Sequence, residues 1–379
     1  IPSNRSLAPY GLELQWWGQA IMDPAQDVVV YVAVDEDNVY VQSRDGIVTA
    51  FQGDSGKRLW SQMLGSTYKV GMPLATNERY VFVAVGLDLF ALNKFTGELE
   101  WELPLTHHPS TAPEADNDHI YIGMVDGSLF CYDLNKIRQF WEEGKLPRFA
   151  ANAFLWKHKA ALELTSPPVS NGEFVSFASL SGTVYSVSTR DHKLKFQFET
   201  DEPIQTPIGR GAGSLFVVSE DSRLYCLNRD TGLRRWTFTS GVPIREQPLV
   251  IGSSVYVTPL NDGMYCLNVA TGTIKWRQQR AAVFLGATDR YVFATDKLNN
   301  VLLLSHDDGG ILGELATQGF TCDLPNERTD RLFLVSPDGL VVCIRETGQE
   351  FPIYYKFPER RPILPELAID PPAAEAPAQ

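Results

Sequence analysis

The sequence lacks long apolar runs and has no excess of basic residues. Its apolar stretches are short, such as residues 28–34, whereas a membrane-spanning helix needs about 20 apolar residues in a row. Asp and Glu number 46 against 33 Lys and Arg, which gives a net charge of −13 over 379 residues. Because nucleic acids are bound by basic surfaces that displace counterions, we expect no nucleic-acid partner. We also expect no transmembrane segment in this chain.

The first residues contain no recognisable signal peptide. Ile1-Pro2-Ser3-Asn4 has neither the charged nor the apolar segment that such a peptide requires. Ile1 is not an initiator methionine, which indicates that another segment preceded it. The sequence leaves open whether that segment was a signal peptide, a lipid anchor or a membrane helix.

Motifs for enzymatic chemistry are also missing. No Cys-x-x-Cys pair, Gly-x-Ser-x-Gly elbow, phosphate-binding loop or His-Glu-x-x-His occurs, so we predict no catalytic, cofactor-binding or metal-binding residues. Acidic clusters occur at 35–38, 116–118 and 307–308, and we interpret them as solvated turns and not as calcium sites. Four of the five cysteines follow a hairpin turn at places where other repeats carry Ala or Ser, which predicts free, buried thiols.

The chain repeats itself with a period of about 40 residues. Residues 39–60 (VYVQSRDGIVTAFQGDSGKRLW) can be laid over residues 215–236 (LFVVSEDSRLYCLNRDTGLRRW) and 255–276 (VYVTPLNDGMYCLNVATGTIKW). A turn of the same type falls near residues 46, 87, 127, 182, 222, 263, 300 and 339. The sequence therefore contains eight repeats, with one insertion of about 15 residues in the third.

Each repeat predicts four short antiparallel strands. Alternating apolar residues separated by Asp-Gly and Thr-Gly turns are typical of β-hairpins. Eight such units predict an all-β fold, an eight-bladed β-propeller of four-stranded antiparallel blades. Repeat 8 lacks the last strand with its Trp, and residues 12–18, which include Trp16 and Trp17, can supply it. We therefore expect the N-terminal strand to close the ring, which protects an open sheet edge.

The domain organisation follows from these repeats. We expect an N-terminal arm over 1–11 and the propeller over 12–357, with the insertion at about 136–153. The last residues, 358–379, are rich in Pro and Ala and predict a flexible tail.

The repeats resemble the pyrroloquinoline-quinone (PQQ) repeat family, whose units combine apolar-Tyr-Ala-Leu-Asp, Thr-Gly and a Trp. Leu89-Phe90-Ala91-Leu92-Asn93 with Thr96-Gly97 and Trp101 matches this pattern, as do residues 225–236 and 265–276. Repeats 4 and 7 depart from it, since Phe196 and Gly313 stand where Trp is expected. The resemblance covers residues 12 to 350.

The resemblance implies two possible functions. One branch of the family consists of PQQ-dependent dehydrogenases, which need calcium and a catalytic carboxylate. The other consists of eight-bladed, non-enzymatic scaffolds of the bacterial envelope that take part in outer-membrane assembly. Length and blade number favour the second branch, which implies a periplasmic or envelope location, protein partners and no cofactor. A quinoprotein dehydrogenase, or a propeller that binds or hydrolyses small molecules such as sugars, is the alternative.

Two groups of residues are singled out by their places in the repeats. Trp60, Trp101, Trp156, Trp236 and Trp276 recur at one place in five of the eight repeats, which predicts packing between adjacent blades and not ligand binding. The candidate interaction surface combines channel-mouth residues with two aromatic residues of the insertion: Lys69, His107, His108, Arg245 and Glu246, with Phe140 and Trp141.

Overall fold

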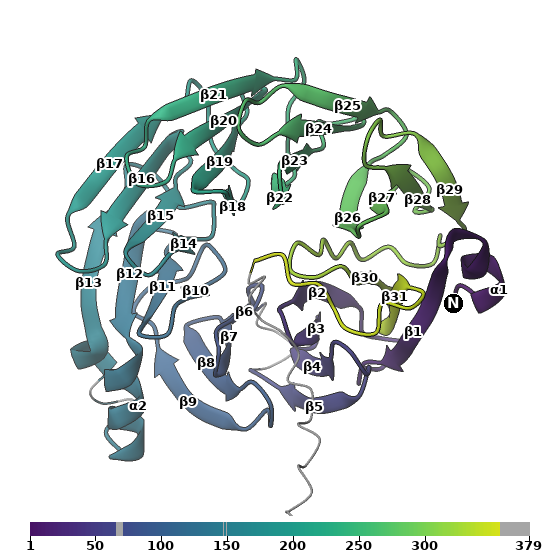
Figure 1. Ribbon diagram of the computed structural model, residues 1–379. Coiled ribbons are helices and arrows are strands. Elements are labelled where there is room, and N and C mark those ends of the chain that lie inside the picture. Colours follow the sequence, from purple (N-terminus) through teal and green to yellow (C-terminus); the bar gives the residue numbers. More distant parts are fainter. Residues whose placement is uncertain (66–70, 147, 149, 357–379) are drawn as a thin grey trace, which may run out of the picture.

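Eight antiparallel sheets stand around a central axis in the computed structural model, which describes residues 1–65, 71–146, 148 and 150–356 (Figure 1). The strands of each blade are given from the innermost outward. Blade 1 consists of β2 (Val29–Val34), β3 (Asn38–Ser43), β4 (Ile47–Gln52) and β5 (Arg58–Met63), and blade 2 of β6 (Ala75–Thr76), β7 (Tyr80–Val85), β8 (Asp88–Asn93) and β9 (Leu99–Pro104). Blade 3 consists of β10 (Glu114–Ala115), β11 (His119–Gly123), β12 (Ser128–Asp133) and β13 (Phe154–Lys159), and blade 4 of β14 (Val169–Ser170), β15 (Phe174–Ala178), β16 (Thr183–Ser188) and β17 (Leu194–Glu199).

The second half of the ring continues this order. Blade 5 consists of β18 (Gly209–Gly211), β19 (Ser214–Ser219), β20 (Arg223–Asn228) and β21 (Arg234–Thr239). Blade 6 consists of β22 (Leu249–Ile251), β23 (Ser254–Val257), β24 (Met264–Asn268) and β25 (Ile274–Gln278). Blade 7 consists of β26 (Val283–Ala287), β27 (Tyr291–Thr295), β28 (Val301–Ser305) and β29 (Ile311–Leu315). Blade 8 consists of β30 (Leu332–Val335), β31 (Leu340–Glu346) and the N-terminal β1 (Leu12–Gln19). The predicted eight-bladed propeller is confirmed.

The N-terminal strand closes the ring, as the sequence predicts. β1 pairs antiparallel with β31, from Leu12 opposite Glu346 to Gln19 opposite Leu340. Blade 8 differs from the expected four strands, because its innermost segment makes only one bridge, Cys322 to Val335. The next residues turn away: Pro325 has no N–H to donate, and the Asn326 amide donates to Leu285 in blade 7.

The core lies between the blades and not within one sheet. Every residue of β7 is buried, since its two faces are covered by neighbouring blades. One apolar cluster joins Phe82 and Trp101 of blade 2 to Ile122 and Phe130 of blade 3, and equivalent clusters follow around the ring. Within the described residues, no helix has the length and apolar character needed to cross a membrane.

The few helical segments lie at the start of the chain and in the insertion. α1 (Asn4–Leu7) and η1 (Ala8–Tyr10) precede β1, while α2 (Leu134–Glu142) and η2 (Ala150–Ala153) lie between β12 and β13. Asp133 caps α2 by accepting a hydrogen bond from the Lys136 amide at 3.0 Å. α2 projects at the outer rim of blade 3 in Figure 1.

Candidate functional site

The propeller presents two different faces because the strands of each blade alternate in direction. One face carries the turns between the second and third strands and the connections between blades, and we call it the hairpin face. The other carries the turns between the first and second and between the third and fourth strands, and we call it the opposite face. Main-chain hydrogen bonds such as Leu105 N–H to Leu87 C=O tie the connections to the hairpin turns.

The recurring tryptophans lie between blades. The indole N–H of Trp60 donates to the Lys94 carbonyl at 3.0 Å, and Trp276 donates to His306 at 2.8 Å, each in the turn of the next blade. The turn glycine lies flat on the ring: a Cβ added at Gly309 would come within 2.5 Å of Trp276. Trp236 makes the same contacts with Val269 and Gly272. These rings are part of the packing between blades.

Two positions around the insertion depart from this pattern. Trp101 is fully buried, but its indole N–H has no hydrogen-bond partner among the described residues, because α2 replaces the usual turn of blade 3. Trp156 stacks on His192 at 5.6 Å between ring centroids. In repeat 7, where Gly313 stands in place of Trp, Tyr10 of the N-terminal arm fills the space, since a Cβ at Gly313 would lie 2.2 Å from its ring.

Four of the predicted surface residues lie on the hairpin face, two in the connection between blades 2 and 3 and two in the connection between blades 5 and 6. His107, His108, Arg245 and Glu246 are exposed. The His107 ring packs edge-on against Phe130 at 5.3 Å, and Arg245 lies 3.9 Å from Glu220. Burial and the negative charge of Glu246 raise the pKa of Asp323. Lys69 lies outside the described residues.

The two insertion aromatics lie elsewhere and differ from each other. α2 joins a third strand to a fourth strand, so it belongs to the opposite face, away from His107 and Arg245. Phe140 is half-buried and packs against the core of blades 2 and 3, whereas Trp141 is 38% exposed. The structure therefore divides the predicted surface in two. Of the two aromatic side chains, Trp141 is the one accessible to a partner.

The acidic turn at 35–38 is not the solvated turn that we expected. Asp35 is 3% exposed, and its Oδ1 accepts hydrogen bonds from the amides of Asp37 and Asn38. Its other oxygen lies 3.0 Å from Nζ of Lys94 in blade 2, and Asp37 lies 2.9 Å from the same ammonium. The two carboxylates raise the pKa of Lys94 although burial acts in the other direction. The cluster is an ionic contact between blades.

The cysteines of the chain carry no disulfide. All five cysteines are free, four of them are buried, and burial raises the pKa of the half-buried Cys322 to about 11. No group of three or more His, Cys, Asp or Glu side chains within the described residues is arranged to hold a metal ion.

A row of exposed apolar residues on the hairpin face was not predicted. Leu87, Val125 and Leu162 are 38, 51 and 51% exposed, and the half-buried Leu180 continues the row. We call these four residues of blades 2 to 4 the apolar arc. Exposed apolar groups of this kind mark contact surfaces. A signal existed in the sequence, because Leu87, Val125, Leu180, Leu260 and Leu298 occupy the same turn in five repeats.

These features define a PQQ-repeat β-propeller. The family model described as "Outer membrane protein assembly factor BamB" matches residues 44–191, 144–237 and 181–291, which together span more than half of the chain. The chain belongs to this family.

Individual relatives are distant in sequence. The outer membrane protein assembly factor BamB of Shewanella oneidensis is 23% identical over 214 residues, which cover 54% of this chain and 52% of that protein. The chain thus matches about half the length of this curated relative. The crystal structure of BamB from Moraxella catarrhalis has a TM-score of 0.69 at 17% identity and covers 89% of this chain and 98% of that one.

A designed protein has the same fold. The computationally designed Ika8 protein gives a TM-score of 0.67 at 13% identity, with 86% of this chain and 99% of that chain covered. At such identities the structural matches establish the fold alone.

Proposed function

We propose that this protein is a non-enzymatic scaffold for outer-membrane protein assembly in a bacterial envelope, and that it binds a protein partner through the apolar arc of its hairpin face. Family membership supports the assembly role. The observation that carries the binding surface is the exposure of Leu87, Val125 and Leu162 in successive turns and connections of blades 2 to 4 on one face.

The arc has the composition of a protein contact. Apolar anchors surrounded by polar residues dominate the energy of many interfaces, while a charged rim sets orientation and the rate of association. Here the anchors lie in turns held by main-chain hydrogen bonds, such as Leu105 to Leu87 and Ala160 to Gly127. Ordered turns lose little entropy on binding, which favours affinity.

The test compares variants on the two faces. Leu87→Asp combined with Leu162→Asp charges the arc, and Leu233→Asp, at a residue that is 70% exposed in a turn of the opposite face, is the matched control. Each variant is expressed in a strain of the native bacterium that lacks the protein, and the levels of outer-membrane proteins in that strain are measured. A photo-crosslinker at Val125 reports direct contact.

We expect the arc variant to fold and yet to leave outer-membrane protein levels low, whereas the control restores them. Crosslinks from Val125 should identify a component of the assembly machinery. Normal outer-membrane protein levels in the strain without the protein would contradict the assembly role. Full activity of the arc variant would contradict the proposed surface.

A further inference from the structure

The segment that follows β31, up to Lys356, lies at the mouth of the central channel of the propeller. After β31 it passes through an exposed turn at Thr347-Gly348 and then crosses toward the centre of the ring (Figure 1). We call residues 349–356 the strap. The strap reaches the opposite face, where the turns between first and second strands surround the channel.

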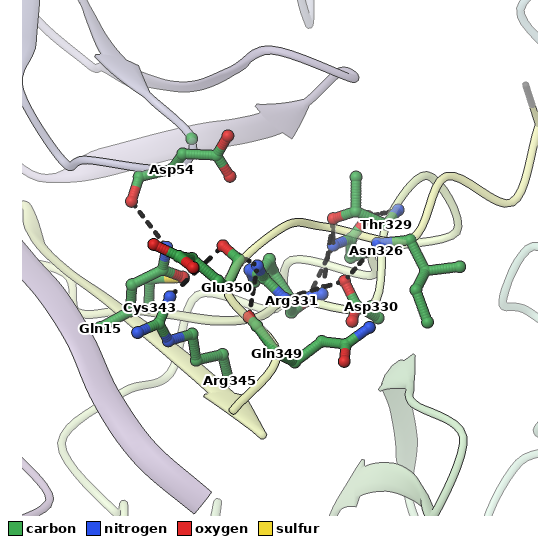
Figure 2. A network of polar contacts seen from close by, with 12 residues as sticks. Gln15, Asp54, Asn326, Thr329, Asp330, Arg331, Cys343, Arg345, Gln349 and Glu350 are labelled. Carbon is green, nitrogen blue, oxygen red and sulfur yellow. Dashed lines mark hydrogen bonds and ion pairs between the residues drawn. The ribbon is translucent and has the colours of Figure 1, made fainter. Parts of the chain in front are cut away.

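The main chain of the strap is held by side chains of blade 8 (Figure 2). Arg331 is 2% exposed, and its guanidinium donates to the carbonyls of Gln349 and Glu350 at 3.1 and 3.3 Å. The Ile353 amide donates to the Asp330 carboxylate at 3.0 Å, and the Asp330 amide donates back to the Ile353 carbonyl. Buried charged groups thus bind backbone atoms, which any peptide carries.

The last two residues of the strap, Tyr355 and Lys356, contact the ring through their side chains. The Tyr355 hydroxyl donates to the Ala287 carbonyl of blade 7 at 2.7 Å, while the Tyr355 amide donates to the main-chain carbonyl of Arg328. The Lys356 ammonium forms an ion pair with Glu327, and both side chains are largely buried. An extended segment that ends in Tyr-Lys is therefore contacted by two blades.

Two further ion pairs of the described residues lie at this mouth and do not involve the strap. Arg328 lies 2.8 Å from Glu36 of blade 1, and Arg210 lies 2.9 Å from Glu114 of blade 3. Glu327, the Asp330 carboxylate and the Arg331 guanidinium, by contrast, have partners in the strap. Without an occupant, these groups would lose hydrogen bonds in a poorly hydrated place, which is unfavourable.

We propose that this channel mouth is a peptide-recognition site, specific for an extended segment with an aromatic-basic end, and that the chain's own strap occupies it. The site reads two carbonyls through Arg331, one amide through Asp330 and the Lys356 ammonium through Glu327. It lies on the face opposite the apolar arc, so its failure would leave the assembly role untouched.

The test cuts the full chain after it has folded. A protease recognition sequence is inserted between Thr347 and Gly348, the protein is cleaved, and gel filtration shows whether the C-terminal fragment stays with the ring. We expect co-elution, and displacement by an excess of a synthetic peptide with the sequence of the strap, QEFPIYYK. Lys356→Met should accelerate fragment release about 10- to 100-fold, as expected for the loss of a contact between charged groups.

Lys193→Met is the matched control, because that lysine is 82% exposed and distant in sequence from the strap. A fragment that separates at once from a ring with an unchanged circular dichroism spectrum would overturn the proposal. If the cleaved ring unfolds, hydrogen exchange on the uncut chain decides. The Ile353 and Tyr355 amides should exchange about tenfold faster or more in Lys356→Met than in Lys193→Met. Equal rates would refute recognition of the basic end.

Discussion

The indole N–H of Trp16 donates to the main-chain carbonyl of Gly53 at 2.7 Å, and this bond joins the first strand of the chain to blade 1. The Trp16 ring lies between Phe51 and Phe333, whereas the adjacent Trp17 is 58% exposed. The neighbouring tryptophans therefore form a natural pair for testing how the ring is closed.

Trp16→Ala should lower the free energy of unfolding by about 3–5 kcal/mol, since it empties a buried site between two blades. Trp17→Ala should change it by no more than about 0.5 kcal/mol, as is usual for surface positions. Urea titration monitored by circular dichroism measures both. Equal effects of the two substitutions would mean that the contact of β1 with blade 1 does not stabilise the ring.

Arg331→Met should be among the most damaging single substitutions in blade 8. It leaves the carboxylate of Asp330, which is 3% exposed, without its cation, and the loss of one partner of a buried pair costs about 3–5 kcal/mol. Arg345→Met is the control, because its pair with Glu13 is partly exposed and worth about 0–1 kcal/mol. Adding Asp330→Asn to Arg331→Met should recover part of the stability, and chemical denaturation of all three variants would show whether it does.

The buried Lys356 predicts an unusual dependence of stability on pH. Burial, together with Arg328 and Arg210, lowers its pKa from 10.5 to about 8 in spite of Glu327. Between about pH 8 and 10.5 the unfolded chain therefore binds more protons than the folded one at this residue, so its contribution to stability rises with pH. Unfolding of the natural protein and of Lys356→Met between pH 7 and 10 should show the natural protein gaining relative to the variant. A relative loss would indicate an ordinary ion pair with a raised lysine pKa.

When PQQ and calcium are mixed with the protein, the absorbance spectrum of PQQ should be the same as without the protein. The mixture should produce no dye-linked oxidation of alcohols or sugars. The physical reason is that acidic side chains such as Asp35 and Asp37 are already neutralised by Lys94 and so are poor calcium ligands. A calcium-dependent spectral change at stoichiometric PQQ would support the dehydrogenase alternative.

The repeat pattern predicted the fold because each blade is a local unit. Its strands follow one another in sequence, its turns recur every 40 residues, and the missing Trp of repeat 8 pointed to residues 12–18. The division of the predicted surface was not visible in the pattern. His107 and Trp141 belong to the same repeat, but the segments that contain them lie on opposite faces of the propeller.

The strap and its site were missed for a different reason. Thr329-Asp330-Arg331 reads as an ordinary polar turn, and its burial depends on residues 349–356 returning across the channel. Tyr355 bonds to Ala287, 68 residues earlier, and no periodicity marks such a pair. Non-local contacts of single residues leave no signature in one sequence.

Closure of the ring by β1 also sets the order in which the molecule can be completed. Glu13 and its ion-pair partner Arg345 are 332 residues apart, so blade 8 forms only when both ends of the repeat array are present. Loops of this length close slowly, and a folding chain exposes the unpaired edge of β1 until the last repeat is in place. The first strand of the propeller is thus among the last to gain its partner, and rapid folding of the other seven blades shortens the time in which its open edge can aggregate.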